Sequence, residues 1–214
     1  MACDAERVKG SVVGLLLAAG AGRRMGQPKA LVNDDHGVPW VLGTTRRLLD
    51  AGCDRVRVVL GAEAEVAAGL LEPVRATVDV VVAADWATGM AASLRAGLVD
   101  LAQAAPTATA ALVHLVDLPD VGVNVLRRVL ESASAGCGDA LARAAYSGVP
   151  GHPVLIGRSH WAGVADSASG DRGARDYLAA RHVDLVECGD LATGNDVDRS
   201  PGGAPTSRAA RGDG

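Results

Sequence analysis

Short apolar runs and longer amphipathic segments alternate along this chain of 214 residues. Continuous apolar runs, such as residues 12–18, are typical of strands that are buried on both faces of a parallel sheet. The segments between them have the length of helices. The predicted strands cover residues 12–18, 55–60, 77–84, 110–116 and 183–187. The predicted helices cover residues 40–51, 63–71, 89–105, 123–135 and 173–181.

Strands that alternate with helices in this way form βαβ units, so the pattern predicts an α/β fold with a doubly wound, mostly parallel sheet flanked by helices. The alternation of predicted strands and helices ends at about residue 140, and residues 147–153 are rich in glycine and proline, with one serine. This composition predicts a small inserted hairpin before the chain rejoins the sheet. Ligands of such sheets bind beyond the carboxyl ends of the strands. We therefore expect functional residues after residues 12–18 and 110–116.

The length fits one substantial core. We expect residues 1–10 to be a loose lead-in and residues 11–198 to be a single domain. Residues 199–214 consist largely of Ser, Pro, Gly, Ala and Arg, which predicts a disordered tail.

Composition narrows the class of protein. Hydrophobic residues make up 49% of the chain, but aromatic residues only 2% and phenylalanine is absent, so Val, Leu and Ala must build the core. The net charge of −4 argues against a nucleic-acid partner. The sequence shows neither an apolar run of the ~18 residues that span a membrane nor the order of a signal peptide, so a cytoplasmic location is expected. The four cysteines are scattered, which indicates reduced thiols.

The strongest chemical signal follows the first predicted strand. From Leu17 to Lys29 the sequence reads Leu-Ala-Ala-Gly-Ala-Gly-Arg-Arg-Met-Gly-Gln-Pro-Lys. Glycine-rich backbone can turn its N–H groups onto an oxyanion because no side chain blocks the approach. Arg23, Arg24 and Lys29 add positive charge beside these amides. The segment therefore predicts a polyphosphate site at the end of a buried strand, although a glycine-rich turn with solvated charges is the alternative.

Neither of two common phosphate loops fits this segment. A Walker loop places Lys and then Ser or Thr directly after its last glycine, whereas here Pro28 stands between Gly26 and Lys29. The dinucleotide fingerprint G-x-G-x-x-G opens directly into a helix. Gly20, Gly22 and Gly26 have the spacing G-x-G-x-x-x-G, and Pro28 interrupts any helix that starts there.

The segment resembles the signature of molybdopterin cytidylyltransferases, L-A-A-G-x-G-x-R-M-G-x-P-K, at every fixed position. The resemblance extends from about residue 12 to residue 198 and implies a Rossmann-like nucleotidyltransferase fold. It implies catalytic roles for Arg24, on the β- and γ-phosphates, and for Lys29, on the α-phosphate. The residues implied to bind the nucleotide in this segment are Leu17, Ala18, Ala19, Gly20, Ala21, Gly22, Arg23 and Lys29.

Two acidic positions are candidates for Mg²⁺ ligands. Asp117 closes the strand 110–116, where a carboxylate suits a Mg²⁺ that bridges phosphates; a helix N-cap is the alternative. Asp196 and Asp198 alternate on an extended segment and so point the same way, although a polar turn would also carry them. The family's Asp-x-Pro and Asp-Ile-Asp-Thr-Pro motifs imply that all three bind the metal. The second motif departs here, because residues 199–201 read Arg-Ser-Pro.

A third motif opens the helix 89–105. Gly89-Met-Ala-Ala-Ser-Leu-Arg-Ala-Gly-Leu resembles the family's G-M-S-S-S-L-R-A-G-L. Amides at a helix start and a nearby hydroxyl suit hydrogen bonds to a ribose or a base, so Gly89 and Ser93 are candidate nucleotide-binding residues. Close packing of the helix on the sheet is the alternative reason for these small residues.

Two further motifs imply contact with the acceptor. Residues 148–153 resemble G-x-P-G-H-P, which makes Gly151, His152 and Pro153 candidate substrate residues. Residues 170–175 resemble G-D-x-G-A-R, which adds Asp171. A rigid turn and an Asp-capped helix start are the respective alternatives.

The resemblance implies transfer of a nucleoside monophosphate from a nucleoside triphosphate to a phosphorylated acceptor, with release of pyrophosphate. The implied acceptor is molybdopterin or the molybdenum cofactor, and Mg²⁺ is the implied cofactor. Ala19 favours CTP, because relatives that use GTP tend to have a second glycine there. Alternatives are GTP, an acceptor such as a sugar phosphate or phospho-acid, and a catalytically weak nucleotide-binding partner of a molybdoenzyme client.

Overall fold

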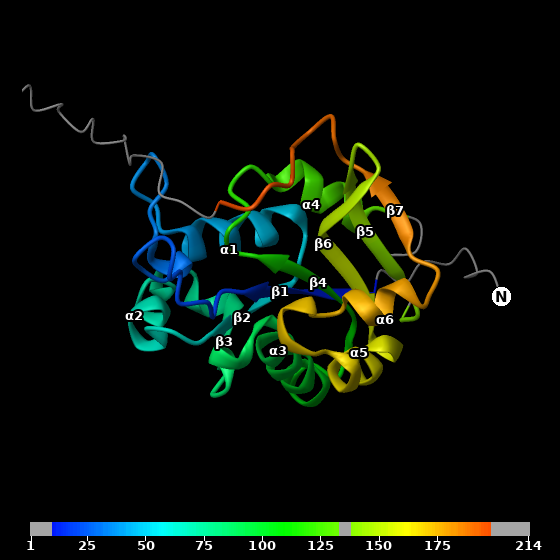
Figure 1. Cartoon of the computed structure of the whole chain (residues 1–214), viewed down its shortest axis with the longest axis horizontal. Helices are drawn as coiled ribbons and strands as arrows, with labels where there is room; N and C mark the ends of the chain where they lie inside the picture. Colours follow the sequence, from blue (N-terminus) through cyan, green and yellow to red (C-terminus); the bar gives the residue numbers. More distant parts are fainter. Residues whose placement is uncertain (1–9, 133–137, 198–214) are drawn as a thin grey trace, which may run out of the picture.

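The computed structural model describes residues 10–132 and 138–197. Within these residues, seven strands form one sheet in the order β3-β2-β1-β4-β6-β5-β7 (Figure 1). The strands are β1 (Ser11–Leu17), β2 (Arg55–Leu60), β3 (Val78–Val82), β4 (Ala108–Leu115), β5 (Leu141–Tyr146), β6 (Val149–Gly157) and β7 (Asp184–Glu187). Only the pairs that involve β6 are antiparallel in this part of the chain. The prediction of a mostly parallel sheet is confirmed.

Helices cover both faces of the sheet. They are α1 (Trp40–Ala51), α2 (Ala64–Gly69), α3 (Met90–Ala104), α4 (Val123–Leu130), α5 (Trp161–Ser167) and α6 (Arg175–Ala179). In Figure 1, α1 and α4 lie together above the sheet, and α3 and α5 lie together below it. None of the helices in the described residues is both long enough and apolar enough to cross a bilayer.

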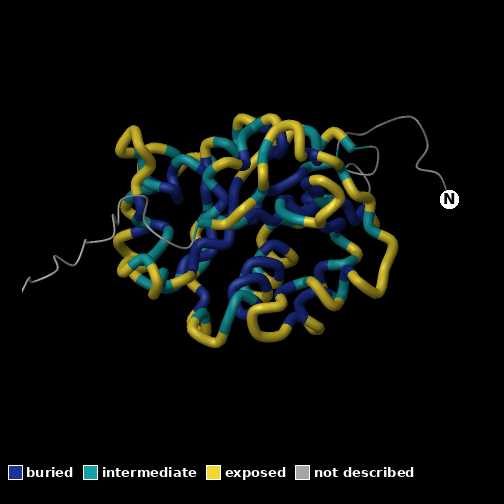
Figure 2. Tube along the Cα trace, turned by 45° about the horizontal axis from the view of Figure 1, so that its top comes forward, coloured by how far each residue is buried: buried dark blue, intermediate teal, exposed yellow. Residues whose placement is uncertain are grey.

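The core explains why the first strand is a continuous apolar run. Leu15 and Leu16 of β1 are both fully buried, and since successive side chains of a strand point to opposite faces, they enter different cores. Leu16 packs in the layer under α1 and α4, and Leu15 packs in the layer over α3 and α5. Figure 2 shows the resulting pattern, with buried backbone in the middle and exposed loops around it.

The predicted hairpin exists, but its strands β5 and β6 lie within the main sheet between β4 and β7. Ser147 and Gly148 form its two-residue turn with positive φ angles of 52° and 78°, as tight hairpins require. The helix predicted for residues 123–135 ends at Leu130, and α5 was not predicted because its seven residues are too few to show a helical period. The predicted tail and nearly all of the predicted lead-in lie outside the described residues.

A buried histidine gives the fold a pH dependence. His114 of β4 is fully buried, and neither of its ring nitrogens has a hydrogen-bond partner in the part of the chain that the structure describes. Burial, with smaller contributions from the charges of His152 and Arg47, holds the pKa of His114 well below its ordinary value. Burial and the charge of Arg143 lower the pKa of His152 to about 4. Both imidazoles are therefore neutral in the fold.

We expect the free energy of unfolding to fall as the pH is lowered. In the unfolded chain both histidines take up a proton at about pH 6.5, whereas in the fold they stay neutral to lower pH. The free energy of unfolding therefore falls as the pH drops below this value, by up to about 1.4 kcal/mol per pH unit for each histidine. His114→Leu should reduce that slope by about one histidine's share. Urea unfolding at several pH values measures it. An equal slope in wild type and His114→Leu would contradict the assignment.

Candidate nucleotide site

An open cleft of about 370 Å³ lies beyond the carboxyl ends of β1 and β4. This is the place where α/β sheets bind ligands. Its lining residues come from the glycine-rich loop, the end of β4, the start of α3 and the turn before α6. They are Leu17, Ala18, Ala19, Gly20, Ala21, Arg23, Lys29, Trp86, Ala87, Gly89, Met90, Ser93, Leu115, Val116, Asp117 and Asp171. Most of the predicted nucleotide-binding residues therefore share one cleft.

The loop after β1 has a fixed, tightly turned backbone. The N–H of Ala62 donates to the carbonyl of Ala19 over 3.0 Å, which ties the start of the loop to the end of β2. Gly22 has a φ of +58°, and a Cβ there would lie 1.9 Å from the carbonyl oxygen of Gln27, so only glycine fits. The chain then enters the short 3₁₀ turn Lys29–Leu31, not an α-helix. This geometry agrees with the rejection of both common phosphate loops.

Lys29 and Asp117 meet across the cleft. The Lys29 ammonium donates to Oδ2 of Asp117 over 2.7 Å, and the two side chains are 17% and 18% exposed. The pair joins the glycine-rich loop to the end of β4, although the residues are 88 positions apart. A cation and a carboxylate, both partly shielded from water, thus lie side by side in the lining of the cleft.

The two loop arginines differ in their position relative to the main cleft. Arg23 lines the main cleft, and it also borders an adjoining hollow of about 220 Å³ that includes Arg24 and Met25. Both arginines are exposed. Arg24 therefore stands beside the main cleft and does not line it.

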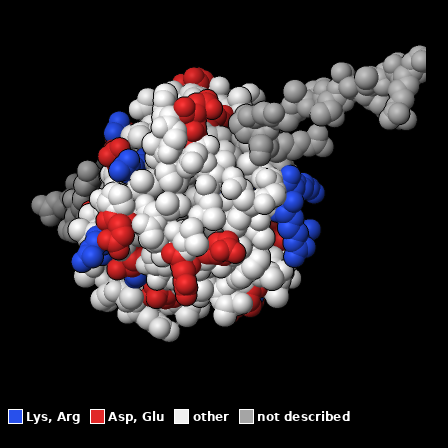
Figure 3. All heavy atoms as spheres, turned by 90° about the vertical axis from the view of Figure 1, so that its left-hand side faces the viewer, with Lys and Arg blue, Asp and Glu red and all other residues white. Residues whose placement is uncertain are grey.

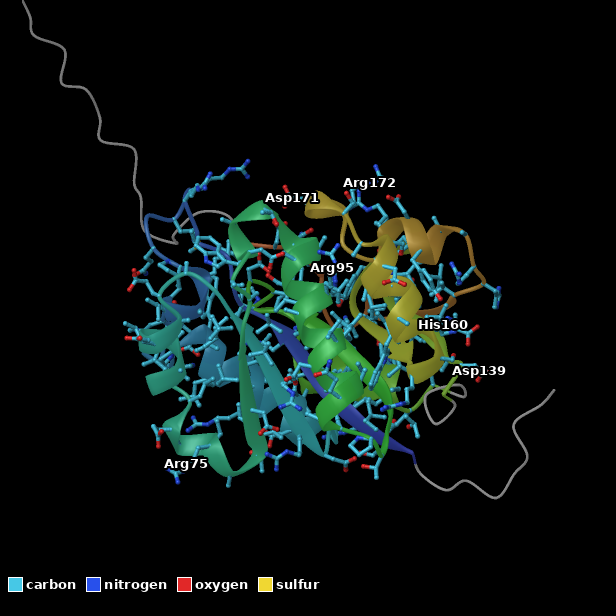
Figure 4. All side chains as sticks on the ribbon, turned by 90° about the horizontal axis from the view of Figure 1, so that it is seen from below. Arg75, Arg95, Asp139, His160, Asp171 and Arg172 are labelled. Carbon is cyan, nitrogen blue, oxygen red and sulfur yellow. The ribbon has the colours of Figure 1, made fainter. Side chains whose placement is uncertain are left out.

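The start of α3 carries the next group of predicted residues. Gly89 has a φ of +128° and is pressed against the backbone of Gly170, where a Cβ would lie 2.7 Å from a carbonyl carbon. Ser93 is buried and lines the cleft. Asp171 accepts the N–H of Met90 through Oδ1 over 3.3 Å and so caps α3 from a distant turn. Figure 4 shows Asp171 at the start of this helix. Asp171, a candidate for the acceptor side, thus lies in the same cleft as the nucleotide residues.

The other candidate acceptor residues lie in the first half of β6. Gly151, His152 and Pro153 belong to the same sheet edge as Asp117, because β6 runs antiparallel beside β4. The Tyr146 hydroxyl donates to the carbonyl of His152 over 2.6 Å, and Arg143 donates to the carbonyl of Gly151. Among the described residues that line the main cleft, none comes from this motif. The motif is a neighbour of the cleft.

The C-terminal acidic segment reaches Asp117. The N–H of Val197 donates to the carbonyl oxygen of Asp117 over 3.0 Å, which places the exposed Asp196 next to this contact. Asp198 lies outside the described residues. Within the described ranges, no three His, Cys, Asp or Glu side chains are grouped as a metal site would need. The structure therefore brings two of the three predicted metal ligands into one neighbourhood without completing a ligand set.

Asp120 is a functional candidate that the sequence patterns did not single out. Its Oδ2 accepts the N–H of Thr193 (2.7 Å), the hydroxyl of Thr193 (2.6 Å) and the N–H of Gly194 (3.2 Å). Gly194 has a φ of +68° and packs on the ring of Tyr146, which leaves no room for a Cβ. In Figure 1 this segment runs from β7 back across the top of the molecule. Asp120 thus holds the acidic segment over the end of β4.

We expect Asp120→Ala to release that segment. Three hydrogen bonds that one carboxylate accepts from the segment are lost. Amide hydrogen exchange at Val197 should rise by about tenfold or more, as local opening becomes easier. Asp190→Ala is the control, because it removes the ion pair with Arg128 without touching these bonds. Unchanged exchange at Val197 would show that Asp120 does not hold the segment.

Basic side chains form no continuous stripe on one face of the molecule. Figure 3 shows the face that forms the left side of Figure 1, where basic side chains lie toward the edges and acidic ones lie both near the middle and at the edges. On this face they form separate groups, not the continuous basic stripe that a nucleic-acid backbone requires.

The geometry defines the class of the protein. A mostly parallel sheet, a glycine-rich loop after its first strand and an Asp at the end of the adjoining strand, paired with a Lys of the loop, are the features of a Rossmann-like nucleotidyltransferase. Residues 14–185 match the family model of the MobA-like NTP transferase domain. The chain belongs to this family.

Two known proteins are similar to this chain over most of their length. A protein called nicotine blue oxidoreductase, from Paenarthrobacter nicotinovorans, is 41% identical over 199 residues, which is 87% of this chain and 92% of the relative. The crystal structure of Rv0371c from Mycobacterium tuberculosis is 29% identical, with a TM-score of 0.70 over 90% of this chain and 95% of that chain.

Two further solved structures are similar. A manganese complex of Rv0371c is 27% identical, with a TM-score of 0.57 over 83% of this chain and 87% of that one. A nucleotidyl transferase from Methanothermobacter, 24% identical with a TM-score of 0.67 over 83% and 87% of the two chains, shares the fold.

Proposed function

We propose that this nucleotidyltransferase moves a nucleoside monophosphate from CTP to a phosphate of a molybdopterin-type acceptor. An acceptor phosphate oxygen bonds to the α-phosphorus, the bond from that phosphorus to the β-phosphate oxygen breaks, and pyrophosphate leaves with the electron pair. The observation that carries the proposal is the Lys29–Asp117 pair in a cleft that the glycine-rich loop also lines. Family membership supports the reaction class.

Different groups of the site act on different phosphates of the nucleotide. The amides of residues 19–22 and the guanidinium of Arg24 hold the β- and γ-phosphates. The ammonium of Lys29 stabilises the charge that develops around the α-phosphate, where a fixed cation is most effective. Such a reaction needs positioning and charge neutralisation and no covalent intermediate on the protein.

A divalent cation fits the acidic residues. Mg²⁺ is usually held by one or two carboxylates together with the phosphates of its substrate, and Asp117 and the segment of Asp196 offer such a pair. The manganese complex of Rv0371c supports a divalent ion in this family. Asp117, Asp196 and Asp198 would hold Mg²⁺ or Mn²⁺, which when bound would neutralise the phosphate charge.

The proposal also specifies which nucleotide and which acceptor the enzyme uses. Ala19, buried at the start of the loop and in the lining of the cleft, is the residue that favours CTP over GTP. The motif at Gly151, His152 and Pro153, next to β4, supports a pterin acceptor that enters from the β6 side. A molybdoenzyme would then receive the product.

The relative called an oxidoreductase favours a second candidate function. At 41% identity it is similar over nearly its whole length. In that case the cleft would hold a reduced nicotinamide dinucleotide without the G-x-G-x-x-G fingerprint, which the loop lacks. Its hydride would pass to a conjugated ring compound that also takes up a proton.

Pyrophosphate release separates these candidates. Purified protein is incubated with CTP or GTP and a divalent cation, with and without molybdenum-loaded molybdopterin. Release that requires both CTP and this acceptor supports the proposal, whereas release with a sugar phosphate would replace the acceptor. Tight CTP binding without release would favour a nucleotide-binding partner of a molybdoenzyme. Oxidation of reduced nicotinamide nucleotide in the presence of a conjugated dye, with no pyrophosphate release, would favour the oxidoreductase.

A further inference from the structure

One aromatic side chain lines the nucleotide cleft. The chain has three tryptophans and two tyrosines, all within the described residues. Trp40 and Trp161 are buried at 5% and 2% exposure, whereas Trp86 is only half-buried and borders the cleft. In a chain so poor in aromatic residues, the position of Trp86 calls for an explanation beyond core packing.

The indole of Trp86 is held next to the glycine-rich loop. Trp86 begins the 3₁₀ turn Trp86–Thr88 that precedes α3. A Cβ at Gly61 would lie 2.4 Å from Cγ of Trp86 and 2.7 Å from the carbonyl oxygen of Ala19. Trp86 and Ala19 therefore both press against Gly61, which has no side chain to separate them. This contact places the indole beside the first residues of the phosphate loop.

From this placement we propose that Trp86 is the stacking surface for the base of the nucleoside triphosphate. The inference rests on the proposed function, which places the phosphates on the loop that follows Ala19. A nucleotide extending along the cleft from the loop reaches Trp86 and the start of α3, where Gly89 and Ser93 lie. Every base presents a π-face, and stacking on an aromatic side chain is a large part of base binding.

The location favours the nucleobase over a planar ring of the acceptor. Trp86 contacts the end of β2 through Gly61, and β2 lies on one side of β1. Asp117 and the motif at Gly151 lie on the other side of β1, on β4 and β6. The acceptor candidates Gly151, His152 and Pro153 therefore lie on the other side of β1 from the indole, whereas Asp171 lies at the start of α3.

Intrinsic fluorescence tests the proposal, because Trp86 is the tryptophan at the cleft. Wild type, Trp86→Leu, Trp86→Phe and the control Trp40→Phe are titrated with CTP, GTP and inorganic tripolyphosphate, and affinities are also measured by calorimetry. We expect CTP to quench wild type and Trp40→Phe, tripolyphosphate to quench neither, and Trp86→Leu to lose the quenching. Trp86→Leu should bind CTP roughly 5- to 150-fold more weakly, with unchanged affinity for tripolyphosphate. Trp86→Phe, which keeps an aromatic face, should retain most of the affinity.

Equal CTP affinity in Trp86→Leu and wild type would overturn the proposal, as would equal quenching by tripolyphosphate. Quenching by the molybdopterin acceptor and not by CTP would assign the indole to the acceptor and overturn it as well. If Trp86→Leu does not fold, the comparison of CTP with tripolyphosphate on wild type and Trp86→Phe decides. Base-dependent quenching without pyrophosphate release would support the stacking role and reject the transferase reaction. Release of pyrophosphate with unchanged CTP affinity in Trp86→Leu would support the transferase reaction and reject the stacking role.

Discussion

Replacing Lys29 by alanine should reduce pyrophosphate release by about 10²–10⁴-fold while weakening nucleotide binding far less. The ammonium is expected to act on charge that grows during the reaction, and losing one such group typically costs two to three orders of magnitude or more. Turnover and the CTP dissociation constant, measured separately, give this comparison. Lys29→Arg should recover only part of the rate, because a planar fork places its charge differently from a compact ammonium.

The contact with Asp117 requires a second variant. In Lys29→Ala the carboxylate of Asp117 loses its 2.7 Å partner, and an unpaired, partly buried polar group costs about 1–3 kcal/mol of stability. The double variant Lys29→Ala/Asp117→Ala removes both charges. The double variant should be more stable than Lys29→Ala, because no unpaired carboxylate is left. Its turnover should stay low, because it also lacks the proposed metal ligand Asp117. Normal turnover in Lys29→Ala would refute the catalytic role.

The layered α/β architecture could be predicted because its signals are local. Continuous apolar runs such as residues 12–18 identify strands buried on both faces, and Gly52 ends α1 in the left-handed conformation that glycine favours. The place of β6 could not be read in this way. Its antiparallel insertion between β4 and β5 depends on pairing across the sheet, which no local pattern records.

For the same reason, only part of the candidate site could be predicted from the sequence. The loop from Leu17 to Lys29 was predictable because its glycines and charges are contiguous, and Asp117 because it ends a strand. Trp86 and Asp120 could not be predicted, because their roles depend on partners far away in the chain. Gly61 is 25 positions from Trp86, and Thr193 is 73 positions from Asp120. The cap that Asp171 provides to α3, over 81 positions, was missed for the same reason.

Replacing Asp117 by asparagine should weaken the response of turnover to divalent metal. Asparagine keeps the shape and an oxygen that can accept from Lys29, but it removes the negative charge that a hard cation requires. We expect turnover to fall by about 10²–10³-fold and the Mn²⁺ concentration for half-maximal rate to rise. Binding of Mn²⁺ to the protein with CTP, followed by electron paramagnetic resonance, provides a readout that is independent of turnover.

Asp190→Asn supplies the matched control for Asp117→Asn. It neutralises a carboxylate that pairs with Arg128 on the surface, away from the cleft, so Mn²⁺ binding and turnover should both stay at the wild-type level. Stability should change little in either variant, since an exposed ion pair contributes little and the amide introduced by Asp117→Asn would still accept a hydrogen bond. Undiminished Mn²⁺ binding in Asp117→Asn would mean that the segment of Asp196 holds the metal alone. Asp117 would then serve to hold the Lys29 ammonium in place, and its loss would lower turnover without changing the metal requirement.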